Sequence, residues 1–319
     1  MSNLKCPVVM IGYSRSWTLK QSLYNLAQCY DVNERDIFLF LDAPSKVADQ
    51  IKCDDMYKTA KQVKDTILPR LQIIKRSYNF GVPGNLIAAI NQVTNEYGRA
   101  IFFEDDVLVS RTFLQYEDRA LDFYQDDDRI FCINGYQHPN LHVPRTYRYD
   151  IYLAPRNSAW GFGIWRNRWE SIDFDMKDWN RYKEYADNLI RLEKAGIDIS
   201  GMIERQLSGK IHTWDVQCTF HMMRNNMFAI DPRYGMTKNI GFGSEGVHCS
   251  TQIPFYQKQA YYDFVPKLVK DIAEDPTITS QFKYLCSATN ILTRLSRKIR
   301  RLIAHLAPEN RMPIIVGTK

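Results

Sequence analysis

Three consecutive acidic residues, Glu104, Asp105 and Asp106, end the apolar run AIFFEDD. The near-continuous hydrophobicity of residues 100–105 is typical of a strand that is covered on both faces of a parallel sheet. In open α/β sheets, ligands bind at the carboxyl ends of such strands. Crowded carboxylates at that place suit a hard cation such as Mn²⁺ or Mg²⁺, which keeps open positions for phosphate oxygens. A solvated acidic turn would have the same sequence, so the interpretation depends on the residues that stand nearby.

The alternation of side chains along a strand gives a first expectation for this acidic run. Glu104 and Asp106 should lie on one side of the strand and Asp105 on the other.

Chemically useful residues also follow the other predicted strands. Arg15 follows the first strand, within GYSRS, and Asp42 follows the second. The third strand leads into NFGVPGN, a turn that opens a helix, where glycine permits positive φ and close backbone approach to a ligand. The residues of interest in this turn are Asn79, Gly81, Gly84 and Asn85. Together these groups suit a nucleoside diphosphate, with an acid for the ribose or base, and a cation and a metal for the phosphates.

The elements that would position these residues alternate in type over the first 135 residues. The predicted strands are residues 6–13, 36–43, 71–76 and 100–105. Amphipathic helices are predicted at 16–30, 55–68 and 84–97. This alternation is typical of an α/β domain. Further elements are predicted as a helix at 112–124, a strand at 131–136 and helices at 178–195 and 214–226.

The composition of the 319 residues, with 45% hydrophobic and 24% charged residues, is that of a globular protein. The seven cysteines include no CxxC pair, which argues against a zinc knuckle and fits free thiols in a reducing cytosol. The N-terminal residues predict no signal peptide, and no apolar stretch approaches the roughly 18 residues that would span a bilayer. We therefore expect a cytoplasmic protein.

The net charge of +6 is concentrated between Asn290 and Leu306, where five Lys or Arg residues occur without an acid. The rest of the chain is close to neutral, which argues against nucleic acid as a partner. Apolar residues recur in this segment at three- and four-residue intervals, so it predicts a basic amphipathic helix. Such a helix can lie in an anionic membrane surface, or it can pack on the protein with a solvated basic face. We favour peripheral contact with the inner face of the cell membrane.

The first half of the chain resembles the GT-A nucleotide-sugar glycosyltransferases, in particular the inverting N-acetylglucosaminyltransferase I family, of which it would be a bacterial relative. That family has an Arg after its first strand, an Asp after its second and an EDD motif, and Arg15, Asp42 and residues 104–106 match in order. The resemblance implies a Rossmann-like, mixed but mostly parallel sheet flanked by helices. It also implies that Asp106 holds the metal, while the donor is bound by Arg15, Asp42, Asn79, Gly81, Glu104 and Asp105.

The second half adds to the resemblance. TWDVQCTFHMM (213–223) is similar to the family's segment whose Trp-Asp supplies the catalytic base, which implies Trp214 beside a base at Asp215. Residues 158–169 and 230–249 are similar to the stretches that build the acceptor pocket and a mobile loop over the donor. The implied acceptor and loop residues are Trp160, Gly161, Gly243 and His248. Judged without the family, Asp215 could be a helix N-cap and Trp160 a core aromatic residue.

The predicted function is inverting, metal-dependent transfer of a sugar, by default GlcNAc, from a UDP-sugar to a hydroxyl of a glycan or lipid-linked acceptor, in the synthesis of a surface polysaccharide. Residues 1–135 would bind the nucleotide sugar, 136–260 would form the acceptor and catalytic half, and 261–319 would form a helical tail. One alternative is a sugar-1-phosphate nucleotidyltransferase, although GYSRS lacks the glycine-rich phosphate loop of that class. A non-enzymatic sugar- or membrane-binding protein is another, and it leaves the acidic run unexplained.

Overall fold

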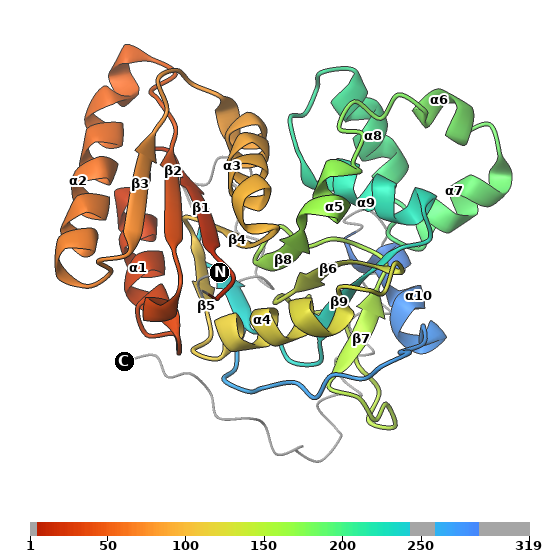
Figure 1. Cartoon of the computed structure of the whole chain (residues 1–319). Coiled ribbons are helices and arrows are strands. Elements are labelled where there is room, and N and C mark those ends of the chain that lie inside the picture. Colours follow the sequence, from red (N-terminus) through yellow and green to blue (C-terminus); the bar gives the residue numbers. More distant parts are fainter. Residues whose placement is uncertain (1–4, 243–258, 287–319) are drawn as a thin grey trace.

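The computed structural model describes residues 5–242 and 259–286, and a central eight-stranded sheet runs through them with the order β3-β2-β1-β4-β8-β6-β9-β7 (Figure 1). The strands of this sheet are β1 Val8–Gly12, β2 Ile37–Leu41, β3 Leu71–Lys75, β4 Arg99–Glu104, β6 Ile130–Asn134, β7 Ile151–Ala154, β8 Phe162–Trp165 and β9 Phe228–Pro232. A separate two-stranded ribbon pairs β5 Val107–Val109 with β10 Thr237–Asn239 in antiparallel fashion.

Helices cover both faces of the sheet (Figure 1). The α-helices are α1 Ser16–Leu26, α2 Gln50–Thr66, α3 Gly81–Tyr97, α4 Phe113–Tyr124, α5 Arg166–Glu170, α6 Trp179–Tyr182, α7 Ala186–Glu193, α8 Ile199–Leu207, α9 Asp215–Arg224 and α10 Pro276–Leu285. Two short 3₁₀ helices are η1 Val32–Glu34 and η2 Val47–Asp49. Within the residues that the structure describes, no helix has both the length and the apolar character needed to cross a bilayer.

Six strands of the sheet run in one direction, and β8 and β7 run in the other. The predicted fold class, a mostly parallel mixed sheet flanked by helices, is therefore confirmed. Strand β8, from the second half of the chain, lies between β4 and β6 from the first half, so both halves contribute to one sheet. The functional boundaries near residues 135 and 260 stay predictions.

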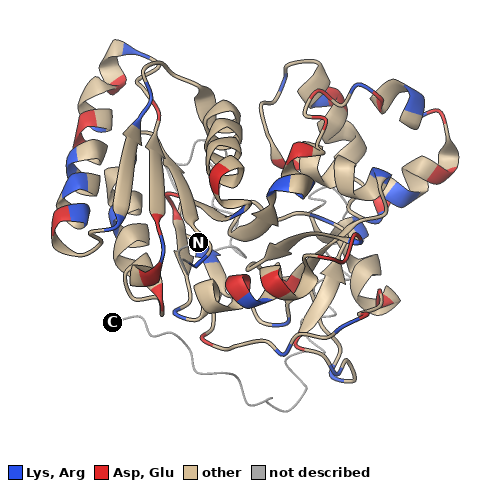
Figure 2. Ribbon diagram, viewed as in Figure 1, with Lys and Arg blue, Asp and Glu red and all other residues tan. Residues whose placement is uncertain are grey.

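Burial on both faces explains the continuous hydrophobicity of the central strands. In β1, Val9 and Ile11 face the cluster that contains α3, whereas Val8 and Met10 face the cluster that contains α1 and α2. All residues of β1 and β2 are buried. Lys and Asp side chains occur instead along the exposed side of α2 (Figure 2), as expected for a helix with one apolar stripe.

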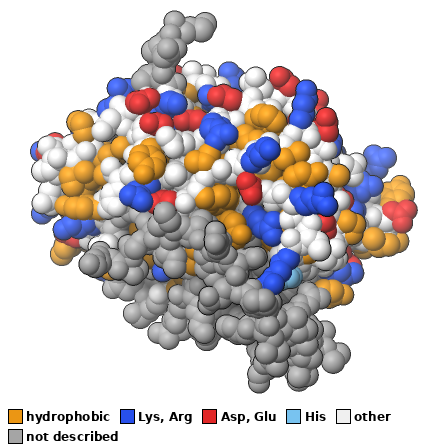
Figure 3. Space-filling model, turned by 90° about the horizontal axis from the view of Figure 1, so that it is seen from below, with side chains coloured by type: hydrophobic (Ala, Val, Ile, Leu, Met, Phe, Trp, Pro, Cys, Tyr) orange, Lys and Arg blue, Asp and Glu red, His pale blue; other side chains and the backbone are white. Residues whose placement is uncertain are grey.

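Charged side chains of both signs also occur over the rest of the surface. On the face seen from below, basic side chains are interspersed with hydrophobic and acidic ones (Figure 3).

Several helix predictions need correction: α1 ends at Leu26 instead of residue 30, and α2 begins at Gln50 instead of residue 55. The helix predicted at 178–195 is divided into α6 and α7, because Tyr185 has an extended backbone with φ −105° and ψ 121°. Asn188 replaces the lost helical bonds by donating its side-chain amide to the carbonyl of Tyr182 at 3.0 Å. Helix α3 begins at Gly81 instead of residue 84. Pro83 is tolerated in the first turn of this helix, because the backbone N–H group that proline lacks would have no partner within the helix at that position.

A buried carboxyl in the middle of the sheet is held by two neighbouring strands. Asp231 in β9 is 4% exposed; its Oδ1 accepts a hydrogen bond from the Asn134 amide at 2.7 Å, and its Oδ2 accepts one from the Tyr152 hydroxyl at 3.3 Å. Burial raises the pKa of Asp231 from an ordinary 3.8 to about 8, although these two hydrogen bonds act in the opposite direction. The folded protein therefore favours the protonated form of Asp231.

This protonation predicts a dependence of stability on pH. Between about pH 4 and pH 8 the folded state holds a proton at Asp231 that the unfolded state has released, so the free energy of unfolding falls as the pH rises. Asp231→Asn, which mimics the protonated acid, should lack this contribution. Its stability relative to the wild type should therefore rise by about 1 kcal/mol per pH unit between pH 5 and pH 7, as measured by urea unfolding. Asp126→Asn, at an exposed site, is the matched control, and parallel wild-type and Asp231→Asn profiles would contradict the prediction.

Candidate nucleotide-sugar site

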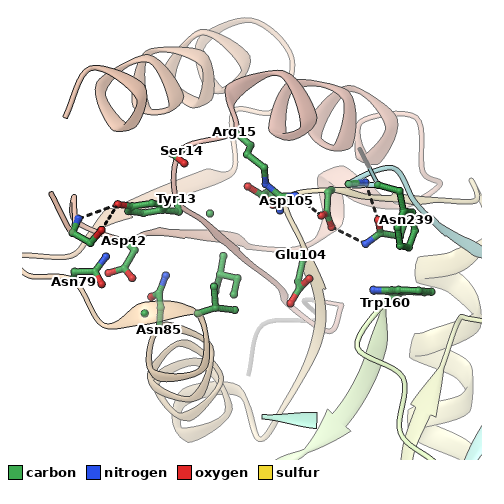
Figure 4. A pocket seen from close by; sticks show the side chains of 18 residues that line it. Tyr13, Ser14, Arg15, Asp42, Asn79, Asn85, Glu104, Asp105, Trp160 and Asn239 are labelled. Carbon is green, nitrogen blue, oxygen red and sulfur yellow. Dashed lines mark hydrogen bonds and ion pairs between the residues drawn. The ribbon is translucent and has the colours of Figure 1, made fainter. Parts of the chain in front are cut away.

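A cavity of about 320 Å³ lies at the carboxyl ends of β1, β2 and β4, beside the first turn of α3 (Figure 4). Its size is in the range of small-ligand sites. The residues predicted to bind donor and metal all line it: Arg15, Asp42, Asn79, Gly81, Glu104, Asp105 and Asp106. They come together because parallel strands end at one edge of the sheet, although more than 90 residues of sequence separate the first from the last.

The acidic run does not continue the alternation of β4, so the expectation for its side chains is wrong. The strand ends at Glu104, and Asp105 and Asp106 form the turn into β5. Both aspartates consequently contact one guanidinium: Arg15 Nη2 lies 2.5 Å from Asp105 Oδ1, and Arg15 Nη1 lies 2.7 Å from Asp106 Oδ2. The Asp105 carbonyl fixes the turn further by accepting a hydrogen bond from the Ser22 hydroxyl at 3.0 Å.

The electrostatics of this cluster are dominated by burial and by the surplus of acid. Burial lowers the pKa of Arg15, but the Asp105 and Asp106 carboxylates outweigh that effect and raise it. Burial raises the pKa of Asp105, and Arg15 opposes the rise. Because Arg15 donates directly to both aspartates, we take them as ionised around a charged guanidinium. The pKa of Glu104 is raised well above its usual range by burial and then by the two neighbouring aspartates.

Two residues of the stretch 230–249, in which the resemblance implied a loop over the donor, complete this end of the cavity. The Asn239 amide donates to Asp106 Oδ1 at 3.0 Å, and Asn239 Oδ1 accepts the backbone N–H of Gly241 at 2.7 Å. A Cβ atom on Gly241 would lie 1.9 Å from Asp106 Oδ2 and 2.8 Å from Arg15 Nη1. The pairing of β10 with β5 brings these residues to the acidic turn, and no pattern in the sequence predicted that pairing.

The opposite end of the cavity is formed by backbone donors around a buried carboxylate. Asp42 Oδ1 accepts the backbone N–H groups of Ala43 at 3.0 Å and of Phe80 at 2.8 Å. Burial raises the pKa of Asp42, and these hydrogen bonds oppose the rise. Asn79 donates to the Ala43 carbonyl at 2.6 Å, so it ties the loop after β3 to the loop after β2.

Other residues of the two loops have structural partners. Asn85, predicted in the turn, lies on α3, donates to the Phe40 carbonyl at 3.0 Å and accepts from Arg76 at 2.9 Å. Tyr13 was not predicted, yet it lines the cavity (Figure 4), and its hydroxyl donates to Asp49 Oδ2 at 2.6 Å. The position of Tyr13 in GYSRS, directly after the first strand, is the sequence feature from which its place in the cavity could have been predicted.

The predicted base lies near the cavity but does not line it. Trp214 is 3% exposed and packs in the core, with its ring stacked on Phe162 at 5.5 Å between centroids and edge-on to Phe102 at 5.8 Å. Helix α9 begins at Asp215, whose negative charge contributes to the raised pKa of Glu104. Glu104 and Phe102 are two residues apart on β4, so both point toward the start of α9.

The N-cap alternative for Asp215 and the implied role of Trp214 can be compared with this geometry. The start of α9 has no side-chain capping hydrogen bond, so the N-cap alternative for Asp215 gains no support. Trp214 has the packing of a core aromatic residue and is not among the residues that line the cavity.

Trp160 and Gly161, which were predicted to contact the acceptor, lie in the loop before β8. Because β8 runs antiparallel to β4, its beginning lies at the same edge as the end of β4. Trp160 lines the cavity and contacts Phe242 edge-on, with 5.6 Å between the ring centroids. Gly161 is buried behind it with φ +99°, and a Cβ there would lie 2.8 Å from Thr237, so Gly161 permits the close packing of this loop. Gly243, His248 and the basic segment 290–306 lie outside the described residues.

The acidic turn fits a divalent cation by the chemistry of its donors. Carboxylate oxygens are the usual ligands of Mg²⁺ and Mn²⁺, which commonly take one or two of them together with water and substrate phosphates. The Arg15 guanidinium already places a positive charge beside Asp105 and Asp106. Among residues 5–242 and 259–286, no three His, Cys, Asp or Glu side chains are arranged to hold a metal by themselves, so water or phosphate oxygens would have to complete the site.

Comparison with known proteins gives distant structural matches only. No protein-family model and no curated protein matches the chain significantly. S. aureus TarS 1–349 is 13% identical, with 75% of this chain and 61% of that chain covered and a TM-score of 0.44. The same protein in complex with UDP is 15% identical, with 60% of this chain and 54% of that chain covered and a TM-score of 0.36. The galactosyltransferase LgtC in complex with donor and acceptor sugar analogues is 10% identical, with 90% of this chain and 99% of that chain covered and a TM-score of 0.37. The chain spans less than two thirds of the TarS chains, and likenesses of this size assign no family.

The contact of Gly241 with the acidic turn predicts a local effect of a single methyl group. Gly241→Ala should push the backbone away from Asp106 and Arg15 and destabilise the protein by about 1–3 kcal/mol, as overpacking does. Gly201→Ala is the matched control, because its Cβ would have no atom within 4 Å and it lies in helix α8, where Ala is favoured. Thermal unfolding of both variants checks the prediction, which fails if Gly241→Ala is as stable as Gly201→Ala.

Proposed function

We propose that this protein is an inverting, metal-dependent GT-A glycosyltransferase related to the N-acetylglucosaminyltransferase I family, with UDP-GlcNAc as the default donor. The observation that carries the proposal is the convergence of Arg15, Asp42 and the acidic turn on one cavity at the carboxyl edge of the sheet. A nucleoside diphosphate needs a carboxylate acceptor for its ribose or base at one end and positive charge for its phosphates at the other, and the cavity would offer both in that order with a divalent cation bound beside Arg15.

The donor would lie across the cavity from Asp42 to Arg15. Asp42, whose Oδ1 is held by two backbone N–H groups, would accept a hydrogen bond from the base or ribose through its other oxygen. Asp106 would hold Mn²⁺ or Mg²⁺, with Glu104 and Asp105 supporting the nucleotide sugar. When bound, such a cation supplies Lewis-acid stabilisation of the charge that develops on the leaving diphosphate.

Asp215 is the proposed general base for the acceptor hydroxyl. Its side chain makes no hydrogen bond with any residue in the described part of the chain, so its oxygens are available to a substrate. The packing of Trp214 in the core fixes the start of α9 and thereby the position of the carboxylate. Asp215 would take the hydroxyl proton as the acceptor oxygen attacks the sugar carbon opposite the leaving diphosphate.

Trp160 would contact the transferred sugar or the acceptor. Its indole lies at the end of the cavity that is next to Glu104 (Figure 4), and Tyr136 and Phe242 hold its ring in place by edge-on contacts at 4.7 and 5.6 Å. Aromatic side chains with an apolar face and a polar edge suit sugar rings. The acceptor would be a glycan or a lipid-linked oligosaccharide in the synthesis of a surface polysaccharide.

A screen of nucleotide sugars tests the proposal. UDP-GlcNAc with Mn²⁺ should raise the melting temperature, because a ligand that binds only the folded state stabilises it, and slow donor hydrolysis should release UDP. Asp215→Asn should keep the thermal shift and lose roughly 10²-fold or more of the transfer rate. Asp175→Asn, at an exposed position, controls for the loss of a carboxylate elsewhere in the second half.

The outcomes separate the alternatives. Consumption of a sugar 1-phosphate with a nucleoside triphosphate would identify a nucleotidyltransferase, and a thermal shift without turnover of any UDP- or GDP-sugar would identify a binding protein. Near wild-type transfer by Asp215→Asn would remove Asp215 from the role of base.

Membrane contact through residues 290–306 would bring the protein to a lipid-linked acceptor. The protein should float with phosphatidylglycerol-containing vesicles at low salt, dissociate at high salt and ignore neutral vesicles, because electrostatic attraction is screened by salt. Replacing Arg294, Arg297, Lys298 and Arg301 by Gln should abolish flotation while leaving the donor-induced thermal shift unchanged. Lack of flotation of the wild type at low salt would exclude membrane contact.

A further inference from the structure

The Arg15 guanidinium occupies the acidic turn in an unusual way. Its two terminal nitrogens do not share one carboxylate but contact two, Asp105 at 2.5 Å and Asp106 at 2.7 Å. In the part of the chain that the structure describes, its side chain has no other acceptor. The arrangement therefore places one positive charge between the two carboxylates, where a bridging cation would also be most strongly attracted.

Both carboxylate oxygens of Asp106 already have hydrogen-bond partners, so this side chain has little freedom to bind a metal cation in addition to the Arg15 guanidinium. Asn239 donates to Oδ1 at 3.0 Å, Arg15 donates to Oδ2 at 2.7 Å, and the Gly241 backbone packs so closely that a Cβ would lie 1.9 Å from Oδ2. The carboxylate therefore cannot turn away from Arg15 without breaking its contacts with the β10 strand. A divalent cation that approached Oδ2 would meet the positive charge of Arg15 at close range.

Arg15, by contrast, is able to move. Its backbone is held at the start of α1, where its carbonyl accepts the Thr18 hydroxyl at 3.0 Å, but its side chain is 21% exposed and lines the cavity. Rotation about its side-chain bonds would take the guanidinium from the carboxylates into the cavity while its backbone stays at the start of α1.

We propose that Arg15 is a resident counter-ion of the acidic turn that competes with the divalent cation for Asp106, so that the cation binds only when the guanidinium leaves Oδ2. Arg15 thereby sets the metal affinity of the free protein and keeps it low. This inference rests on the proposed function for the nature of the cation, and it concerns the protein without donor or acceptor.

The test is Mn²⁺ binding to the full-length protein without nucleotide, followed by the loss of the EPR signal of free Mn²⁺. Arg15→Gln keeps a hydrogen-bonding amide but removes the charge, and it should bind Mn²⁺ roughly tenfold or more tightly than the wild type, because one close unit charge has an effect of about that size. Arg15→Lys, which keeps the charge but lacks the fork that spans two carboxylates, should lie between them.

Thermal unfolding gives a second readout. Without metal, Arg15→Gln should melt below the wild type, because it leaves Asp105 and Asp106 without a counter-charge. Addition of Mn²⁺ should raise its melting temperature more than that of the wild type. Arg70→Gln is the matched control: it removes an arginine that pairs with Asp36 at 2.9 Å at the amino ends of the strands, and it should leave the Mn²⁺ affinity unchanged.

The result has a definite interpretation in each case. Equal or weaker Mn²⁺ binding by Arg15→Gln overturns the proposal, as does the absence of Mn²⁺ binding in both proteins. Tighter binding that disappears in the double variant Arg15→Gln/Asp106→Ala supports it. If no nucleotide sugar binds or turns over while Arg15→Gln still gains Mn²⁺ affinity, the proposed function fails and the competition at Asp106 stands.

Discussion

The attraction between one guanidinium and two adjacent carboxylates is the constraint on which the rest of the site depends. Two unit charges about 4 Å apart interact by about 4 kcal/mol at an effective dielectric constant of 20, and a folded domain has only about 5–15 kcal/mol of net stability. Three consecutive carboxyls at the end of a buried strand therefore require a counter-charge. Arg15 provides it for Asp105 and Asp106, whereas Glu104 is left with a raised pKa. The site consequently favours a cationic or cation-carrying ligand.

Other buried carboxyl groups of the fold have different partners, and the comparison sets the candidate site apart. Asp118 is paired with the fully buried Arg35 at 2.9 Å. Asp231 has only neutral partners, and its raised pKa favours the protonated form. In the acidic turn three carboxyls lie around the single cation Arg15, at the edge of the sheet where the cavity opens. The compensation of charge is incomplete at this edge, which is a condition for binding a charged ligand.

Strand direction explains how residues from both halves of the chain reach a single cavity. The parallel strands β1, β2 and β4 bring Arg15, Asp42 and the acidic turn to one edge, where they form the proposed donor site. The antiparallel strand β8 begins where β4 ends and so brings Trp160 beside Glu104. Helix α9 then places Asp215 on the face of β4 to which Glu104 points. A mixed sheet is therefore what allows residues from the second half of the chain to lie next to the proposed donor site.

The sequence by itself determined the central strands, their α/β order and most of the cavity lining, because buried parallel strands have continuous apolar runs and ligands bind at their carboxyl ends. It could not determine that β4 stops at Glu104, and the alternation assigned to Asp105 was therefore wrong. Nor could it show that Asn239 and Gly241, within the predicted loop region 230–249, reach Asp106 through the β5–β10 pairing across about 130 residues. Local patterns fix which residues can form an element, whereas contacts between distant segments depend on packing that only the tertiary structure decides.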